Sequence, residues 1–165
     1  MSFGRGNRVG VILMMLALVL LQFYLRPRLW DSRVAPDFLL IALLVIAMGS
    51  RPGAGAVAGL LVGLIVDALT PARVGAGMLA HTIVGYLASW GRAVFFAENI
   101  LVHAGMFFAG VWVRNLIVVL ASGSSGATIV REMLTVAPLQ GLTTAVAGML
   151  VLYIVREWFE LRLDV

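Results

Sequence analysis

Six apolar runs, each close to the length of a membrane-spanning helix, occupy most of this 165-residue chain. A helix needs about 20 apolar residues to cross a hydrocarbon core about 30 Å thick, and fewer suffice when flanking Arg and Trp reach the interface. The runs lie at about residues 9–25, 36–48, 53–69, 74–90, 99–121 and 136–155. We therefore predict an all-α bundle of six transmembrane helices in a single polytopic domain, residues 1–165, with no room for a soluble catalytic domain.

The composition agrees with a membrane protein and argues against nucleic-acid binding. The chain is 62% hydrophobic and only 12% charged, far from the profile of a soluble domain. All twelve basic residues are Arg, and they stand singly between apolar runs instead of forming a basic stripe with interleaved aromatic residues. The chain has no cysteine, which excludes disulfides and thiolate metal sites.

The first apolar run follows a basic head and superficially resembles a signal peptide. It has only Gly10 and Gln22 as interruptions, and no small-x-small cleavage site follows it. We expect it to be a retained first membrane helix.

An even number of helices places both termini on one side of the membrane, and the arginines bear on which side that is. The terminal side would carry Arg5, Arg8, Arg51, Arg92, Arg156 and Arg162. The opposite side would carry Arg26, Arg28, Arg33, Arg73 and Arg131. This small excess favours cytoplasmic termini by the positive-inside rule.

Small residues spaced four apart predict which helix faces pack together, because membrane helices associate through close backbone approach. The ridge of the third run is Gly55, Gly59, Gly63 and Asp67, and that of the fourth is Gly77, His81, Gly85 and Ser89. Shorter ridges in the fifth and sixth runs are Met106, Gly110 and Arg114, and Ala137, Gly141 and Ala145. The acid at 67 is therefore expected on a packing face.

Three polar residues, Asp67, Arg114 and Asn115, form a predicted set of buried polar groups. Charges inside a bilayer usually face a partner or a cavity. The partner expected for Arg114 is Asp67, Asp37 or a backbone carbonyl group at a turn. Alternatively, Arg114 lies near one interface and extends to the headgroups. Asp67 lies near its helix end, where it can anchor the turn "TPARVG" that follows.

The segments between the runs have clear turn composition. Residues 49–53 and 70–75 are tight turns with Pro and Gly. We expect "ASGSSGAT", residues 121–128, to be a flexible polar loop, and "IVREMLTV", residues 129–136, to be a short interfacial helix. The start of the second run, Pro36 and Asp37, suits a helix N-terminus.

Residues with catalytic or metal-binding spacing are absent from the sequence. His81 and His103 stand 22 positions apart on separate runs, and no H-E-x-x-H or paired-carboxylate pattern occurs. We expect packing roles for both histidines. The serines of "GSSG" have no histidine at a spacing that suggests a base. We therefore predict no enzymatic activity, no metal and no cofactor.

Residues 36–90 resemble the rod-shape-determining protein MreD family. The family pattern has a helix opening with Pro and an acidic or polar residue, then G-x-x-x-G-L-x-x-D, then a Gly opening a helix with a Gly-Tyr pair. The matching positions are Pro36 and Asp37, then Gly59, Gly63, Leu64 and Asp67, then Gly75 or Gly77, then Gly85 and Tyr86. The match covers about a third of the chain closely.

The resemblance implies a multi-pass protein of the bacterial inner membrane that belongs to the elongasome, the machinery for side-wall peptidoglycan synthesis. It implies a non-enzymatic scaffold that binds MreC within the membrane and connects to MreB and to RodA with its penicillin-binding transpeptidase. Residues expected to pack helices or to bind MreC are Pro36, Asp37, Gly55, Gly59, Gly63, Asp67, Gly77, His81 and Gly85.

The family's fold is similar to that of the S components of energy-coupling-factor transporters. This similarity supplies an alternative function, a substrate-binding S component that captures a vitamin or a metal. Such a protein should have a deep pocket with polar side chains in its outer half, and the sequence has few polar residues to line one.

Overall fold

The computed structural model of the chain describes residues 5–29, 31, 33–69, 75–94 and 100–158. The elements are α1 Arg5–Tyr24, η1 Arg26–Arg28, α2 Phe38–Met48, α3 Pro52–Leu69, α4 Ala76–Val94, α5 Ile100–Ala121, α6 Gly126–Arg131, η3 Glu132–Val136 and α7 Ala137–Trp158. Every regular element in this part of the chain is helical, so the all-α prediction is confirmed. Six of the helices lie within four residues of the predicted runs.

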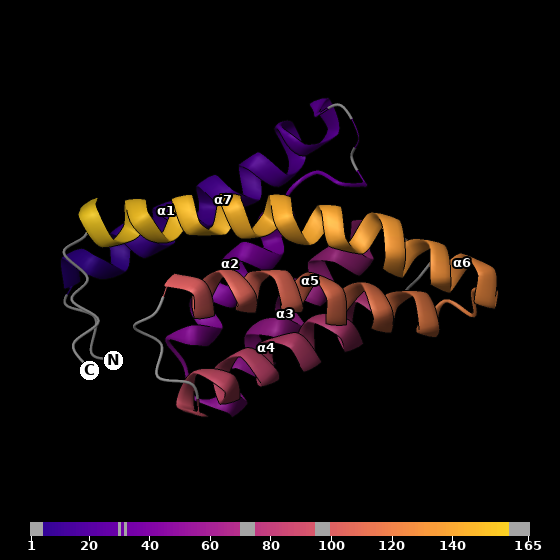
Figure 1. Cartoon of the computed structure of the whole chain (residues 1–165). Helices are drawn as coiled ribbons and strands as arrows, with labels where there is room; N and C mark the ends of the chain where they lie inside the picture. The colour runs from indigo at the N-terminus through magenta and orange to yellow at the C-terminus, as the bar shows by residue number, and fades with distance from the viewer. Residues whose placement is uncertain (1–4, 30, 32, 70–74, 95–99, 159–165) are drawn as a thin grey trace.

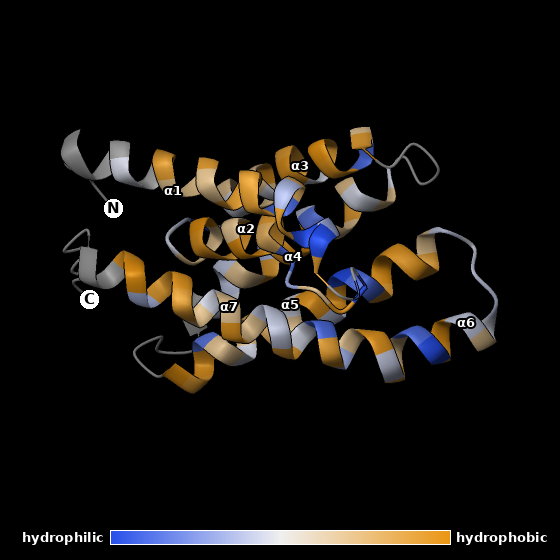
Figure 2. Cartoon of the chain, turned by 90° about the horizontal axis from the view of Figure 1, so that it is seen from above, coloured by the Kyte–Doolittle hydropathy of each residue, from blue (hydrophilic) through white to orange (hydrophobic). Residues whose placement is uncertain are grey.

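The long helices form an up-and-down bundle, with the start of α1 and the end of α7 at the same end (Figure 1). In Figure 2 most of the hydrophilic segments gather on the side of the bundle away from these two helix ends, while the outer helices are mainly apolar. The bundle therefore has a polar half and an apolar half along its length.

Helix α2 is the centre of the bundle. It is apolar all round, and nine of its eleven residues are buried. It contacts α1, α3, α4, α5 and α7. A helix without a polar face must be covered on every side, and here the other helices provide that cover. The short second run is therefore an internal helix surrounded by protein.

Three helices among the described residues are long and apolar enough to cross a membrane. These are Pro52–Leu69, Ile100–Ala121 and the continuous helix Gly126–Val155. The central helix Phe38–Met48 is apolar but shorter. Length and composition alone therefore support three of the six predicted spans, and the membrane character of the protein follows from them.

The small-residue ridges of α3 and α4 pack directly against each other. A Cβ atom added at Gly59 would lie 2.0 Å from the backbone oxygen of His81, and one added at Gly63 would lie 2.4 Å from the Cα atom of Met78. A Cβ atom at Gly55 would lie 2.5 Å from the backbone oxygen of Gly85. Only hydrogen at the Cα positions of α3 permits this approach of the two backbones.

Helices α5 and α7 pack in a different way, with aromatic rings against glycine. An added Cβ atom at Gly141 would lie 2.8 Å from the ring of Phe108, and one at Gly148 would lie 2.8 Å from the ring of Phe107. The Phe107 side chain is completely buried. Glycines of α7 thus provide the space for two large rings of α5.

The expected interfacial helix at residues 129–136 is wrong, and so is the extent of the loop before it. Gly126 already begins α6, and α6, η3 and α7 follow without a break. The Ala137 N–H bonds to the Glu132 oxygen, which is a π-type contact. Pro138 has no N–H for the carbonyl group four residues earlier, and a widened turn lets the helix pass a proline.

Several sequence-based expectations lie outside the described residues. The tight turn at residues 70–75 is described only at Gly75, so no role of Arg73 at that turn is described. Of the arginines counted for orientation, Arg162 and the side chains of Arg5, Arg8, Arg92 and Arg156 are also outside the described part.

Gly59→Ala should destabilise the bundle by about 2 kcal/mol, because a methyl group has no space between α3 and α4. Reversible unfolding in detergent measures the change. Gly53→Ala is the matched control, since an added Cβ atom on that glycine of the same helix meets nothing within 4 Å. Equal stabilities of the two variants would contradict the close α3–α4 contact.

Candidate functional site: a buried polar cluster

The buried polar cluster is centred on Asp37, the residue that precedes α2. Its Oδ1 atom accepts a hydrogen bond from the Leu40 N–H at 3.1 Å, so Asp37 is the N-cap of α2. The side chain is only 3% exposed. The expectation that this acid favours the start of the second helix is therefore confirmed, although α2 itself begins two residues after Pro36.

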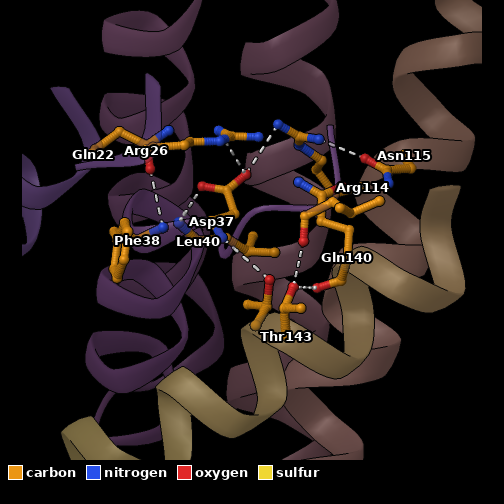
Figure 3. Close-up of polar contacts among 11 residues, drawn as sticks. Gln22, Arg26, Asp37, Phe38, Leu40, Arg114, Asn115, Gln140 and Thr143 are labelled. Atoms are coloured by element: carbon orange, nitrogen blue, oxygen red, sulfur yellow. Dashed lines mark hydrogen bonds and ion pairs between the residues drawn. The ribbon is translucent and has the colours of Figure 1, made fainter. Parts of the chain in front are cut away.

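Two arginines from other parts of the chain surround the Asp37 carboxylate (Figure 3). Arg114 of α5 places its Nη2 atom 3.0 Å from Asp37 Oδ2, and Arg26 of η1 places its Nη1 atom 3.9 Å from the same oxygen. Of the acids that the sequence offers for Arg114, the structure pairs it with Asp37, and the Asp67 alternative is wrong. The close pair therefore joins α5 to the start of α2.

Burial lowers the pKa of the Arg26 guanidinium, Asp37 raises it, and the nearby Arg114 lowers it again. Arginine nonetheless stays protonated at physiological pH, because guanidinium is a very weak acid. Both guanidinium groups lie near the same oxygen of Asp37, so one carboxylate is shared by two cations. The three residues together carry one excess positive charge.

Arg114 also begins a chain of hydrogen bonds that leads to α7. Its Nη1 atom donates to Asn115 Oδ1, and Asn115 Nδ2 donates to Gln140 Oε1 at 2.8 Å (Figure 3). The buried Nε atom of Arg114 has no hydrogen-bond partner among the described residues. Because guanidinium carries five N–H donors, Asp37 and Asn115 leave part of this donor set available.

The segment that leads into α2 is fastened to α7 and α1. Thr144 Oγ1 accepts the Asp37 N–H at 3.1 Å, and Thr143 Oγ1 donates to the Val34 oxygen at 2.6 Å. Gln22 of α1 accepts the Phe38 N–H at 3.0 Å. These bonds satisfy backbone groups that would otherwise be costly to place in an apolar surrounding.

The Asp67 carboxylate holds the start of α4. It accepts the N–H groups of Gly75 at 2.8 Å, Gly77 at 2.9 Å and Met78 at 3.0 Å. The first N–H groups of a helix have no partner within the helix, and its N-terminus attracts negative charge. The sequence expectation that Asp67 anchors the turn after its helix agrees with this geometry.

Two glycines make the Asp67 contact possible. Gly75 has a φ of 95°, in the left-handed region that favours glycine. A Cβ atom added at Gly77 would lie 2.2 Å from Asp67 Oδ1. His81 follows on the same face and is fully buried, with its Nδ1 atom 2.7 Å from the Gly77 oxygen. This contact is a packing role for His81.

The predicted site residues fall into two groups in the structure. Asp37 lies with Arg114 and Asn115 in the polar cluster, and Pro36 directly precedes Asp37 in the chain. The α3–α4 contact contains Gly55, Gly59, Gly63, Asp67, Gly77, His81 and Gly85. Of the two roles expected for these residues, helix packing agrees with the geometry, because the α3 and α4 ridges cover each other, whereas binding of MreC through them stays a prediction.

Residues Gln22, Gln140, Thr143 and Thr144 belong to the cluster and were missed in the sequence. A signal was present, since positions 140, 143 and 144 have the spacing of one helix face. Gln22 interrupts the first apolar run in the same manner. Polar residues on one face of an otherwise apolar helix therefore predict a buried polar contact.

A pocket of about 300 Å³ opens beside the polar cluster. Its lining combines apolar and polar side chains, namely Gln22, Phe23, Arg26, Leu39, Val66, Leu69 and Arg114. The described residues contain no group of three or more His, Asp or Glu that could hold a metal ion. The chemistry available at this pocket is therefore that of guanidinium and amide groups.

A family model for the rod shape-determining protein MreD matches residues 6–159 of the chain. The chain belongs to the MreD family. This match includes every long helix almost completely, so the resemblance found in residues 36–90 extends to α5 and α7. MreD membership implies a role in determining rod shape.

Comparisons with curated proteins and with solved structures found no significant match. The similarity of this MreD fold to the S components of energy-coupling-factor transporters therefore stays a prediction.

Asp37→Asn and Arg114→Gln should each destabilise the protein by about 3 kcal/mol, because each leaves buried charge without its partner. The loss of stability in the double variant should be smaller than the sum of the two single losses by at least about 1 kcal/mol, since the two residues contact each other. Unfolding in detergent measures all three. A second double-mutant cycle, with Asp67→Asn and Arg114→Gln, is the control. An interaction energy between Asp67 and Arg114 as large as that between Asp37 and Arg114 would contradict the assigned ion pair.

Asp67→Asn should weaken the start of α4 by about 1 kcal/mol, because the neutral amide has one acceptor oxygen in place of two. Amide hydrogen exchange at Gly77 and Met78 should become faster. Asp31→Asn is the control, because Asp31 is exposed and, among the described residues, its carboxylate accepts only the local N–H of Arg33. Unchanged exchange in Asp67→Asn would show that the carboxylate does not cap α4.

Proposed function

We propose that this MreD-family chain is a non-enzymatic membrane scaffold of the elongasome that binds MreC directly within the bilayer. The family match over residues 6–159 is the observation that carries this proposal. The scaffold connects to MreB and to the RodA–transpeptidase pair, directly or through MreC. Its role is to hold these partners together during peptidoglycan synthesis in the side wall.

The packing of the bundle supports a scaffold. Helix α2 is enclosed by five other helices, and Asp37 links it to α5 through the Arg114 ion pair. Helices α3 and α4 touch backbone to backbone. A body joined in this way keeps the relative positions of its outer faces, which is what a platform for several partners requires.

The surface proposed for MreC is the exposed apolar exterior, since the glycine ridges are covered. Large apolar side chains are more than half exposed on several helices, among them Leu16 of α1, Leu61 of α3, Leu120 of α5 and Leu150 of α7. In a bilayer such side chains face lipid or a neighbouring helix. A single helix of MreC needs only one of these faces.

The proposed location is the bacterial inner membrane, with cytoplasmic termini. The start of α1 and the end of α7 lie at the same end of the bundle (Figure 1), as this orientation requires. The polar half with Asp37 and Asp67 then lies toward the periplasm. The arginine distribution supports the same orientation.

Thiol cross-linking tests the contact with MreC, because the chain has no cysteine of its own. Single cysteines replace Leu16, Leu61, Leu120 and Leu150, and are paired with cysteines along the membrane helix of MreC. We expect cross-links in cells at one face only, because one helix covers one face. Mass spectrometry of the product identifies the positions.

Ala80→Cys is the control for this experiment, because Ala80 is fully buried on α4. It should give no cross-link to MreC. Each variant must also restore rod shape to cells depleted of the native protein. If all variants restore shape and none forms a cross-link, direct binding of MreC is contradicted.

A further inference from the structure

The pocket beside the polar cluster lies among α1, η1, α2, α3 and α5, and none of the contacts described above fills it. Its volume is about 300 Å³, at the lower limit for sites that bind small molecules. Arg26 follows the end of α1, so the pocket lies in the half of the bundle away from the helix ends near the two termini (Figure 1).

The charges at this pocket do not balance. Both guanidinium groups that line it share one carboxylate, that of Asp37. The nearby acid Asp67 has its own partners, the N–H groups at the start of α4. Among the described residues, one positive charge is therefore uncompensated in this partly buried site, where an unpaired charge is costly.

The positions of the two arginines favour an added anion. Arg26 lies at 3.9 Å from Asp37, too far for a direct hydrogen bond, and its side chain is 19% exposed at the pocket. The Arg114 side chain is 16% exposed, and each of its Nη atoms carries a second N–H besides the one directed to Asp37 or Asn115. Figure 3 shows the two guanidinium groups side by side above the Asp37 carboxylate. Both therefore retain donors for a second anionic group.

The other side chains that line the pocket indicate what the rest of the ligand must be. Phe23, Leu39, Val66 and Leu69 are apolar, and Phe23 and Leu69 are also substantially exposed. A group that pairs with arginine at one end and contacts apolar side chains at the other has the chemistry of a phospholipid near its headgroup. Arginine binds phosphate oxygens through paired N–H bonds.

We propose that the pocket between Arg26 and Arg114 binds a phosphate group, and that the apolar wall of α1 and α3 accepts the adjoining chain of a lipid. The phosphate supplies the negative charge that the cluster lacks. The lipid comes from the leaflet at the end of the bundle away from the termini. This proposal is independent of MreC binding, because it concerns the chain alone.

Lipid exchange in nanodiscs tests the proposal with the purified full chain. The discs contain phosphatidylcholine with increasing phosphatidylglycerol, and native mass spectrometry measures the lipid that stays bound. We expect one phosphatidylglycerol to be retained in preference to phosphatidylcholine. Arg26→Gln should weaken this binding about tenfold, the effect of losing one charge-assisted hydrogen bond.

Arg28→Gln is the matched control, since Arg28 is an exposed arginine of the same short helix and does not line the pocket. It should bind lipid as the unchanged protein does. Val66→Phe provides a second test that alters no charge. The larger side chain occupies part of the pocket beside its apolar wall. It should also reduce lipid retention, and its thermal stability shows that the bundle is folded.

Inorganic phosphate, added to the discs that contain phosphatidylglycerol and to discs of phosphatidylcholine alone, distinguishes the two sources of the anion. Phosphate that displaces phosphatidylglycerol and protects the protein from thermal unfolding shows a site that also accepts the free ion. Phosphatidylglycerol binding without any effect of phosphate shows a site for a lipid headgroup. The proposal is overturned if neither anion binds preferentially, or if Arg26→Gln and Arg28→Gln lose equal affinity.

Discussion

The bundle depends on one carboxylate that is almost entirely removed from solvent, that of Asp37. An ionised acid in such a place is tolerated only when cations and hydrogen-bond donors surround it. Asp37 obtains them from Arg114 of α5, from the Leu40 N–H of α2 and, at longer range, from Arg26. Its own N–H donates to Thr144 of α7. Four sections of the chain are therefore positioned by a single residue.

A second constraint acts between α3 and α4, and it involves no charge along most of the contact. Helices α3 and α4 approach so closely that a single methyl group at Gly59 would overlap the His81 carbonyl group. At the end of this contact, the Asp67 carboxylate accepts the first N–H groups of α4. Close packing sets the distance between the helices, and the carboxylate sets their register.

Much of this arrangement could be predicted from the sequence, because a membrane requires helices and small residues at four-residue spacing show where they meet. Gly59 and Gly63 were found in this way. The sequence could not decide the partner of Arg114, because Asp37 caps α2 and Asp67 lies in α3. Only the folded bundle shows which of the two acids is adjacent to Arg114. The continuity of α6 with α7 depends on a π-type turn before Pro138, which composition does not reveal.

That continuity has a consequence for how the protein meets its surroundings. A helix that runs through 30 residues, Gly126–Val155, extends about 45 Å, whereas the hydrocarbon layer is only about 30 Å thick. Without tilt, this helix is about 15 Å longer than the hydrocarbon layer, and its first turns carry the exposed Arg131. The same continuous helix carries Thr144, whose Oγ1 atom accepts the Asp37 N–H, so a displacement of the helix along its axis would reach the start of α2.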